Sequence, residues 1–334
     1  MNSRINIATA MMNGLDDTAF DPQHWQRLNA FANVLNRQPL TTFDDDRAVD
    51  MLNQADVLLG HWGCPMLTAE VLELAPQLKM FAYAAGTVKW QVTDAVWQRD
   101  ILVTSAAAAN AIPVAEYTLA MILLANKGAL AFRERQRNPA VHTRFPQSIG
   151  NYRQRVGIIG ASFVGRAVIE LLRQHAFDVV VYDPYLSSTD AEKIGVTETD
   201  NLLELCASCN VVSLHAPDVE ATRGMLQAGH FAAMRDGATF INTARPALID
   251  QDALASELSD GRISAVLDVS EPEPLPADHP LLGLPNVFVT PHIAGSIGNE
   301  LGRMADLAID EIERFASGMP ALHQITQRDL DRIA

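Results

Sequence analysis

Residues 156–165 constrain the fold of this chain more than any other stretch. An apolar run ends at Gly160, a short turn follows, and apolar side chains then recur with helical spacing at Val164, Val168 and Leu171. This pattern predicts a buried strand, a tight turn and a helix. Such a unit is the building block of parallel sheets covered by helices.

The turn nearly matches G-x-G-x-x-G, the glycine pattern of dinucleotide-binding turns. Gly160 and Gly165 occupy the first and third glycine positions, and Ser162 stands at the second. The backbone N–H groups of such a turn, together with the helix N-terminus, can face a pyrophosphate. Because one glycine is missing, the motif alone is a weak signal. Two consequences of Ser162 are open: its Cβ pushes the pyrophosphate outward, or its hydroxyl donates to a phosphate oxygen.

Strand-like and helix-like runs alternate along the rest of the chain, which predicts parallel sheets with helices on both faces. The expected strands are residues 5–8, 57–60, 81–84, 101–104, 156–159, 179–182, 211–214, 239–242, 265–268 and 287–290. The expected helices include residues 25–35, residues 68–74 with Thr68 as N-cap, a long helix from Pro113 to about residue 137, and an amphipathic helix at 299–316. Five prolines between residues 272 and 285 predict a rigid, non-helical loop.

The composition disfavours several classes of protein. A formal net charge of −15 disfavours binding to nucleic acid or anionic lipid, because both are negative, and an anionic substrate then needs a local positive site. Residues 1–5 lack the apolar core of a signal peptide, and the apolar stretch 114–125 contains Glu116 and is too short to span a bilayer. Three cysteines are too few for a disulfide framework, and Cys206 and Cys209 fit small core residues better than a redox or metal site. We therefore expect a cytoplasmic enzyme without a metal.

Chemically active side chains follow the predicted strands, where ligands bind in open parallel sheets. Asp183 ends the strand after the turn, 18 residues beyond Gly165 (183 − 165). A carboxylate at about this spacing accepts from a ribose 2′-hydroxyl and repels a 2′-phosphate, which favours NAD over NADP. The alternative for Asp183 is a turn residue before Pro184.

Three further strand ends carry Arg245, Asp268 and His292, and Glu273 lies in the proline-rich loop. An arginine at a strand end can hold a carboxylate through paired hydrogen bonds, although a surface arginine is the ordinary alternative. A glutamate beside a histidine favours its charged form, which makes the histidine a proton donor. Together these side chains supply a substrate clamp and an acid–base pair.

Six motifs stand in a fixed order along about residues 80–300. They are Gly160-Ala161-Ser162-Phe163-Val164-Gly165, Asp183, Leu214-His215-Ala216-Pro217, Asn242-Thr243-Ala244-Arg245, Asp268-Val269-Ser270-Glu271-Pro272-Glu273-Pro274 and Pro291-His292-Ile293-Ala294-Gly295. In this order they resemble the D-isomer-specific 2-hydroxyacid dehydrogenases. That family includes phosphoglycerate dehydrogenase, glyoxylate/hydroxypyruvate reductase and formate dehydrogenase.

The resemblance implies an α/β fold of two doubly wound parallel-sheet domains, with a Rossmann cofactor domain inserted in a flavodoxin-like substrate domain and the active site in the cleft. We expect residues 1–104 and 297–334 to form the substrate domain and residues 105–296 to form the NAD domain. The resemblance also implies NAD as the cofactor, a small 2-oxo or 2-hydroxy acid as the substrate, and a homodimer formed through the long helix near residues 113–137.

The family's functional residues carry over to the matching positions. Arg245, Glu273 and His292 correspond to the catalytic set, in which Arg245 clamps the substrate and Glu273 tunes His292, while Asp268 orients the nicotinamide carboxamide. The implied cofactor-binding residues are Gly160, Ser162, Phe163, Val164, Asp183, His215, Ala216, Pro217, Thr222, Thr243, Ala244, Asp268, His292 and Gly295. The implied substrate-binding residues are Ala85, Gly86, Thr87, Asn110, Arg245 and His292.

The chain departs from the family pattern beyond Ser162. Pro246 follows Arg245 where the family usually has glycine, which removes a backbone donor and stiffens the clamp. Lys89 beside the substrate loop adds positive charge there or is simply solvated. His61 and Trp62 end a predicted strand and either shape the substrate pocket or belong to the core or an interface.

Two alternative functions stay open. A formate dehydrogenase belongs to the same family, but formate oxidation needs no charged proton donor, and a glutamate at residue 273 supports one. Transcriptional corepressors that sense NADH as dimers also resemble this family, and such a binding module does not require turnover.

Overall fold

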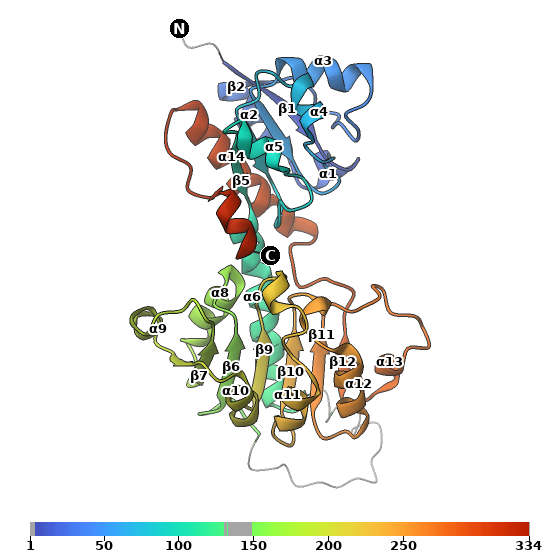
Figure 1. Ribbon diagram of the computed structural model, residues 1–334, viewed down its shortest axis with the longest axis vertical. Helices are drawn as coiled ribbons and strands as arrows, with labels where there is room; N and C mark the ends of the chain where they lie inside the picture. Colours follow the sequence, from blue (N-terminus) through green and yellow to red (C-terminus); the bar gives the residue numbers. More distant parts are fainter. Residues whose placement is uncertain (1–3, 130–131, 133–148, 334) are drawn as a thin grey trace. The chain divides into compact units, whose positions relative to one another are not determined.

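The computed structural model describes residues 4–129, 132 and 149–333. The chain divides into two compact units (Figure 1). Unit 1 is Met1–Asn110 with Ser296–Ala334, and unit 2 is Ala111–Gly295. The chain therefore passes from unit 1 to unit 2 after Asn110, whereas the predicted boundary lies after residue 104. The assignment of unit 1 to the substrate remains a prediction.

The sheet of unit 1 has six strands in the order β13-β5-β4-β3-β1-β2. The strands are β1 (Ile5–Ala10), β2 (Ala32–Val34), β3 (Val57–Gly60), β4 (Met80–Tyr83), β5 (Leu102–Ser105) and β13 (Gln324–Ile325). The first five pair in parallel in the flavodoxin-like order, as predicted. The short strand β13 pairs antiparallel to β5 and was not predicted.

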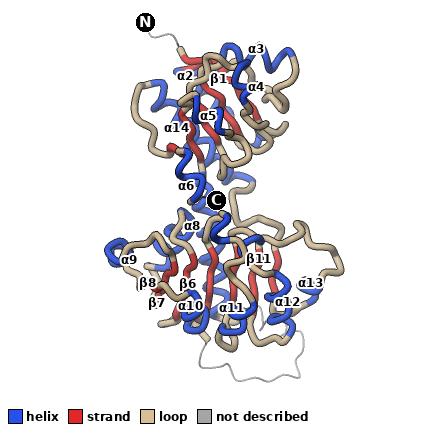
Figure 2. Tube along the Cα trace, viewed as in Figure 1, coloured by secondary structure: helices blue, strands red, loops and turns tan. Residues whose placement is uncertain are grey.

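Helices cover both faces of this sheet (Figure 2). They are α1 (Leu15–Thr18), α2 (Pro22–Phe31), α3 (Asp46–Gln54), α4 (Ala69–Leu74), α5 (Asp94–Gln98) and α14 (Leu301–Ala316). Alternate strand residues point to opposite faces, so Leu58 packs with α3, α4 and α5, and Val57 and Leu59 pack with α2 and α14. Thr68 caps α4 as predicted, because its hydroxyl accepts from Val71 N–H.

The sheet of unit 2 has seven strands in the order β12-β11-β10-β9-β6-β7-β8, all parallel. They are β6 (Arg155–Ile159), β7 (Asp178–Tyr182), β8 (Thr197–Thr199), β9 (Val211–Leu214), β10 (Thr239–Asn242), β11 (Ser264–Leu267) and β12 (Val287–Val289). This is the Rossmann order, and the chain reverses direction across the sheet between β6 and β9. The predicted α/β fold class is confirmed in both units.

Helices also cover both faces of the unit 2 sheet. They are α6 (Ala107–Asn126), α8 (Phe163–Leu172), α9 (Ser188–Ile194), α10 (Leu202–Ser208), α11 (Ala228–Ala233), α12 (Gln251–Ser259) and α13 (Pro280–Gly283). One core contains α6, α8 and α9, and the other contains α10, α11 and α12. Cys206 and Cys209 belong to the second core as buried free thiols, and burial raises the pKa of both.

The predicted start of α6 at Pro113 is wrong. The helix begins at Ala107, because the Ser105 hydroxyl accepts a hydrogen bond from Ala107 N–H at 3.1 Å, and Pro113 lies inside it. At 20 residues, α6 is long and apolar enough to cross a membrane by length and composition. The prediction that the apolar stretch is too short to span a bilayer is therefore wrong as well. Core helices pass the same test, and Ala115 and Ile122 of α6 are buried in the core of unit 2. The predicted end near residue 137 lies outside the described residues.

Two other expectations need correction. Residues 32–34 form β2 rather than the end of a helix, because the chain after Phe31 pairs with β1. The proline-rich loop contains the short helix α13, because Pro280 occupies its first turn, where a missing N–H has no consequence.

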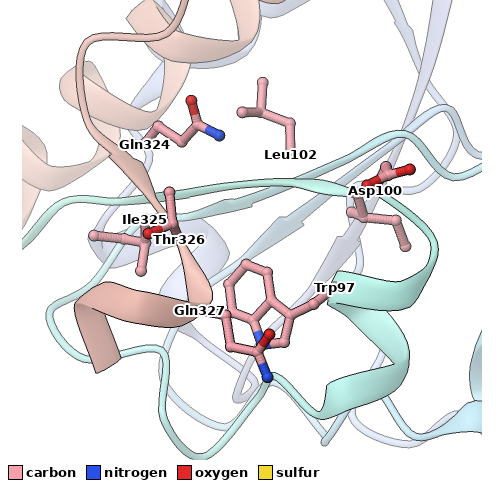
Figure 3. A pocket seen from close by; sticks show the side chains of 8 residues that line it. Trp97, Asp100, Leu102, Gln324, Ile325, Thr326 and Gln327 are labelled. Carbon is pink, nitrogen blue, oxygen red and sulfur yellow. The ribbon is translucent and has the colours of Figure 1, made fainter. Parts of the chain in front are cut away.

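A hollow of about 430 Å³ lies in unit 1, between the connection from α5 to β5 and the segment around β13 (Figure 3). It is lined by Trp97, Asp100, Ile101, Leu102, Gln324, Ile325, Thr326 and Gln327. None of these is a predicted site residue, so this hollow is separate from the chemistry considered next.

Candidate active site

The strands of unit 2 end in register along one edge of the sheet. Tyr182 pairs with Ile159, which pairs with Leu214, and the pairing continues across the sheet through Asn242 and Leu267 to Val289. The residues that follow these strand ends therefore form one row, which in sheet order is Asp183, Gly160, His215, Thr243, Asp268 and Thr290. This edge is where an open parallel sheet binds ligands.

The fingerprint turn requires its two glycines. Gly160 has φ +96°, and a Cβ on it would lie 2.6 Å from the backbone nitrogen of Ala216. A Cβ on Gly165 would lie 2.0 Å from the carbonyl oxygen of Gly160. Both positions are therefore closed to larger residues, and the turn is packed directly against the segment that follows β9.

Ser162 has an ordinary extended backbone, with φ −66° and ψ −177°, so the position does not need glycine. Its hydroxyl donates to the carbonyl oxygen of His215 at 2.8 Å and accepts from Gly165 N–H at 3.3 Å. Ser162 is thus the N-cap of α8. The hydroxyl proton is already used within the chain, which differs from the expectation that it donates to a phosphate oxygen. The effect of the Ser162 Cβ on a pyrophosphate stays a prediction.

The first helical N–H groups remain available for a ligand. The backbone N–H groups of Ser162, Phe163 and Val164 have no hydrogen-bond partner among the residues that the structure describes. Their position at the start of α8 suits an anion such as a pyrophosphate. Phe163 is exposed, and Ala161 N–H donates elsewhere, to Asp183.

Asp183 closes the turn from the neighbouring strand. Its Oδ2 accepts from Ala161 N–H at 2.6 Å, and its Oδ1 accepts from Tyr185 N–H at 2.8 Å. Each oxygen keeps acceptor capacity, because a carboxylate has about four lone-pair sites. The side chain is therefore a turn residue that can also accept from ribose hydroxyls.

His215 and Thr222 use their side chains within the fold. His215 is 3% exposed, and its Nε2 lies 2.8 Å from the hydroxyl of Ser213. Burial lowers the pKa of His215 to about 3, so the ring is neutral near pH 7. The Thr222 hydroxyl shares its one proton between the carbonyls of Pro217 and Val219. Ala216, which follows His215, is buried in the core of unit 2, and the binding of a cofactor by Ala216 and Pro217 stays a prediction.

His292 and Glu273 form a direct pair. His292 Nδ1 lies 2.8 Å from Glu273 Oε1, and the two side chains are 47% and 38% exposed. Among the described residues, no hydrogen-bond partner is found for Nε2 of His292. His292 has φ +57°, a conformation that non-glycine residues adopt only when surrounding contacts hold it.

Asp268 provides those contacts. Its carboxylate is 1% exposed and accepts from Ile293 N–H and Ala294 N–H, each at 2.8 Å. It also accepts from the hydroxyl of Thr290 at 2.6 Å, and its backbone carbonyl accepts from His292 N–H at 2.9 Å. Asp268 therefore fixes the backbone of His292 and of the two residues that follow it, and it holds the side chain of Thr290. Its Oδ2 takes a single bond within the described residues and keeps a site for a carboxamide.

Arg245 follows β10 on the same edge. Its Nη1 donates to the carbonyl of Ala244 at 2.7 Å, and the carboxamide of Asn242 bridges Ala244 N–H and the Arg245 carbonyl. Burial lowers the pKa of Arg245, while the negative charges of Asp218 and Glu273 oppose that shift. The guanidinium stays charged and gives this acidic chain a local positive site. Pro246 begins a helical turn directly after it.

Two further predicted cofactor residues are Thr243 and Gly295. The Thr243 hydroxyl lies 3.2 Å from that of Thr118 on α6, and both side chains are buried. Gly295 is the last residue of unit 2.

Among the described residues, no group of three or more His, Cys, Asp or Glu side chains could hold a metal ion.

The predicted substrate residues of unit 1 follow β4 and β5. Ala85 is buried, and the Ser105 hydroxyl contacts the carbonyls of both Ala85 and Gly86. Lys89 N–H donates to the Thr87 hydroxyl at 3.3 Å. These contacts shape the loop at residues 85–87.

Asn110, at the end of unit 1, holds the returning chain. Its Oδ1 accepts from Ser296 N–H at 2.9 Å. A Cβ on Gly86 would lie 3.9 Å from Asn110 Nδ2, so the amide is beside the loop. Of the two aromatic candidates, His61 is fully buried and Trp62 is 39% exposed. His61 is therefore a core residue.

Sequence reasoning missed Tyr117, Thr118 and Thr290, which contact the strand-end segments from within unit 2. Their hydroxyls belong to no spaced motif. For Tyr117 and Thr118 the available signal is that both are polar residues on the mostly apolar helix α6, whereas Thr290 directly follows the strand β12.

Comparison with known proteins supplies the family. Residues 119–294 match the NAD-binding domain of the D-isomer specific 2-hydroxyacid dehydrogenases. The chain is 31% identical over 300 residues to D-3-phosphoglycerate dehydrogenase of Methanocaldococcus jannaschii, covering 89% of this chain and 57% of that protein. It is 32% identical to (S)-sulfolactate dehydrogenase of Chromohalobacter salexigens, covering 84% of this chain and 93% of that protein. The chain spans about half the length of the D-3-phosphoglycerate dehydrogenases that it matches.

Solved structures share the fold at lower identity. A phosphoglycerate oxidoreductase from Rhizobium etli is 23% identical with a TM-score of 0.83, covering 98% of this chain and 100% of that one. A D-isomer specific 2-hydroxyacid dehydrogenase from Lactobacillus delbrueckii, solved with NAD, is 23% identical with a TM-score of 0.80, covering 96% and 100%. The chain therefore belongs to the D-isomer specific 2-hydroxyacid dehydrogenase family, and its second unit contains that family's NAD-binding domain.

Proposed function

We propose that this chain is an NAD-dependent dehydrogenase that interconverts a 2-oxo acid and a D-2-hydroxy acid. The observation that carries the proposal is the pair of His292 and Glu273, joined at 2.8 Å on the strand-end edge that also carries Arg245 and Asp268. An acid–base pair beside a fixed positive charge is the set of groups that reduction of an anionic carbonyl compound requires.

The residues at the turn fit the cofactor. NADH, when bound, supplies the hydride for the carbonyl carbon. The N–H groups at the start of α8, which have no partner among the described residues, would hold its pyrophosphate, and Asp183 would accept from the ribose. A carboxylate at this position disfavours a 2′-phosphate, which supports NAD rather than NADP.

Arg245 and His292 divide the work on the substrate. The Arg245 guanidinium binds the carboxylate of the 2-oxo acid and polarises its carbonyl. His292 donates a proton from Nε2 to the carbonyl oxygen as negative charge develops there, and Glu273 stabilises the imidazolium that can give this proton. Asp268 keeps the His292 backbone in place during the reaction.

Further parts of the proposal follow the family resemblance. Residues 85–87 and Asn110 of unit 1 bind the substrate, and the chain forms a homodimer through α6. The substrate itself is proposed only as a small 2-oxo acid. The relatives' names suggest three candidates to test: the oxo acids that correspond to phosphoglycerate, sulfolactate and glycolate.

A spectrophotometric assay tests the function. Purified protein is mixed with NADH and a panel of 2-oxo acids, and the loss of absorbance at the NADH band is followed. We expect NADH oxidation with at least one acid and, where the product is chiral, the D configuration. Tight NADH binding without oxidation by any acid would contradict the proposal and favour a cofactor-sensing binding module. Oxidation of formate with NAD would favour formate dehydrogenase instead.

A further inference from the structure

A tyrosine on α6 reaches the segment that carries His292. The hydroxyl of Tyr117 lies 2.7 Å from the hydroxyl of Thr290, the residue that follows β12. Thr290 also contacts the Asp268 carboxylate at 2.6 Å. Both contacts belong to unit 2, and neither Tyr117 nor Thr290 has a place in the chemistry proposed above.

The direction of these hydrogen bonds follows from proton counting. A carboxylate only accepts, so the single hydroxyl proton of Thr290 goes to Asp268. The Thr290 oxygen must then accept the proton of Tyr117. Burial raises the pKa of Tyr117, so the phenol keeps that proton near neutral pH. The chain of donors runs one way, from Tyr117 through Thr290 to Asp268.

The network ends on Asp268, which binds the backbone beside the positive-φ residue His292. Asp268 binds the N–H groups of Ile293 and Ala294, which directly follow His292 with its φ of +57°. A non-glycine residue holds such a conformation only while its surroundings determine it. Tyr117 is the outermost donor of the network and ties it to a helix of 20 residues.

We propose that Tyr117 is a positioning residue that fixes Asp268, and through it the backbone of His292, in the geometry needed for proton transfer. The role rests on the proposed dehydrogenase function, since positioning matters only if His292 acts on a substrate. It predicts that loss of the phenol hydroxyl loosens residues 290–294 and slows turnover without removing NADH or substrate binding.

Tyr117→Phe is the variant to test, because it keeps the ring and removes the donor. One lost hydrogen bond corresponds to about a two- to tenfold effect. We expect kcat to fall by that factor while KM for NADH and for the 2-oxo acid changes less than about twofold. Tyr152→Phe is the matched control, because Tyr152 is an exposed tyrosine of the same unit. An unchanged kcat in Tyr117→Phe would overturn the proposal.

A second measurement needs no substrate. Hydrogen exchange followed by mass spectrometry reports the protection of the amides of residues 288–296. We expect about two- to tenfold faster exchange there in Tyr117→Phe, and no change in Tyr152→Phe. Thr118→Val removes the neighbouring α6 hydroxyl, which contacts Thr243 instead, and should leave residues 288–296 unchanged. Unchanged or uniformly faster exchange across the chain in Tyr117→Phe would overturn the role.

A double-mutant cycle measures whether Tyr117 and Thr290 act together. If Tyr117 acts through Thr290, then Tyr117→Phe adds nothing to Thr290→Val in kcat or in exchange. Additive losses would contradict this route, and Thr290→Val also tests the network if Tyr117→Phe does not fold. A wild-type chain that reduces no 2-oxo acid would refute the proposed function, whereas the exchange pattern alone would still decide the role of Tyr117.

Discussion

Ser162 stands where the dinucleotide fingerprint has its second glycine, and its structural role makes a sharp prediction. The hydroxyl donates to His215 and caps α8 through Gly165 N–H. Ser162→Ala removes both bonds. A lost serine cap costs about 1 kcal/mol, and a lost hydrogen bond costs about 1 kcal/mol. We therefore expect unit 2 to lose about 2 kcal/mol of stability, or roughly 4–8 °C in Tm for a unit of this size.

NADH binding should respond far less than stability. Because the hydroxyl proton is already committed to the His215 carbonyl, its removal takes no bond from a phosphate. We expect the Kd for NADH, measured by fluorescence titration, to change less than about twofold. Ser162→Gly should be less destabilising than Ser162→Ala, since glycine at an N-cap costs only a few tenths of a kcal/mol relative to serine.

A matched control separates capping from cofactor contact. Ser187 caps α9 through Asp190 N–H, away from the fingerprint turn, so Ser187→Ala should lower stability without changing NADH affinity. The interpretation of Ser162 fails if Ser162→Ala keeps full thermal stability but binds NADH about tenfold more weakly. That outcome would mean that the hydroxyl donates to a phosphate oxygen.

Three more predictions concern titratable side chains: two buried histidines, the buried Glu311, and Asp183. Burial lowers the pKa of His61 to about 4 and of His215 to about 3, so the unfolded chain takes up protons first as pH falls below about 6.5. Stability measured by urea unfolding should therefore fall with decreasing pH from about 6.5 to 4, by up to about 1.4 kcal/mol per pH unit for each histidine, and His215→Asn should reduce that slope. Glu311 is 1% exposed and accepts from two backbone N–H groups before β13, so Glu311→Ala should cost about 2–4 kcal/mol in unfolding and expose the C-terminal segment to proteolysis. Asp183→Ala should narrow the preference for NADH over NADPH in fluorescence titrations by about tenfold, because the carboxylate that repels a 2′-phosphate is gone; an unchanged ratio would count against that role.

The sequence was sufficient to predict most of the sheets. Continuous apolar runs bounded by polar or turn residues define buried parallel strands, and β3, β9 and β10 have the predicted bounds. Strand β13 escaped prediction because it has two residues and its place depends on Glu311, which lies 13 residues before it (324 − 311). The start of α6 was misplaced because Pro113 is a good first-turn residue, yet the helix begins at Ala107, whose N–H donates to the Ser105 hydroxyl.

For the candidate site, the sequence identified the positions of the residues but not their hydrogen-bond partners. Residues that follow strands could be identified from sequence because parallel strands in register align their ends, which brings Asp183, Asp268 and Arg245 to one edge. The partners of each side chain could not be identified. Asp268 was expected to face nicotinamide, whereas its carboxylate also binds the backbone around His292, and Tyr117 contacts this network from α6. Such contacts depend on packing across distant segments, which residue spacing does not encode.

The central claim is that His292, paired with Glu273, donates the proton in reduction of a 2-oxo acid. The most direct test compares kcat of the wild-type chain with that of His292→Ala, with the Kd for NADH measured on both. We expect kcat to fall by about 10²–10⁴-fold, the usual contribution of a general acid, while NADH still binds. Near-normal turnover in His292→Ala would contradict the account.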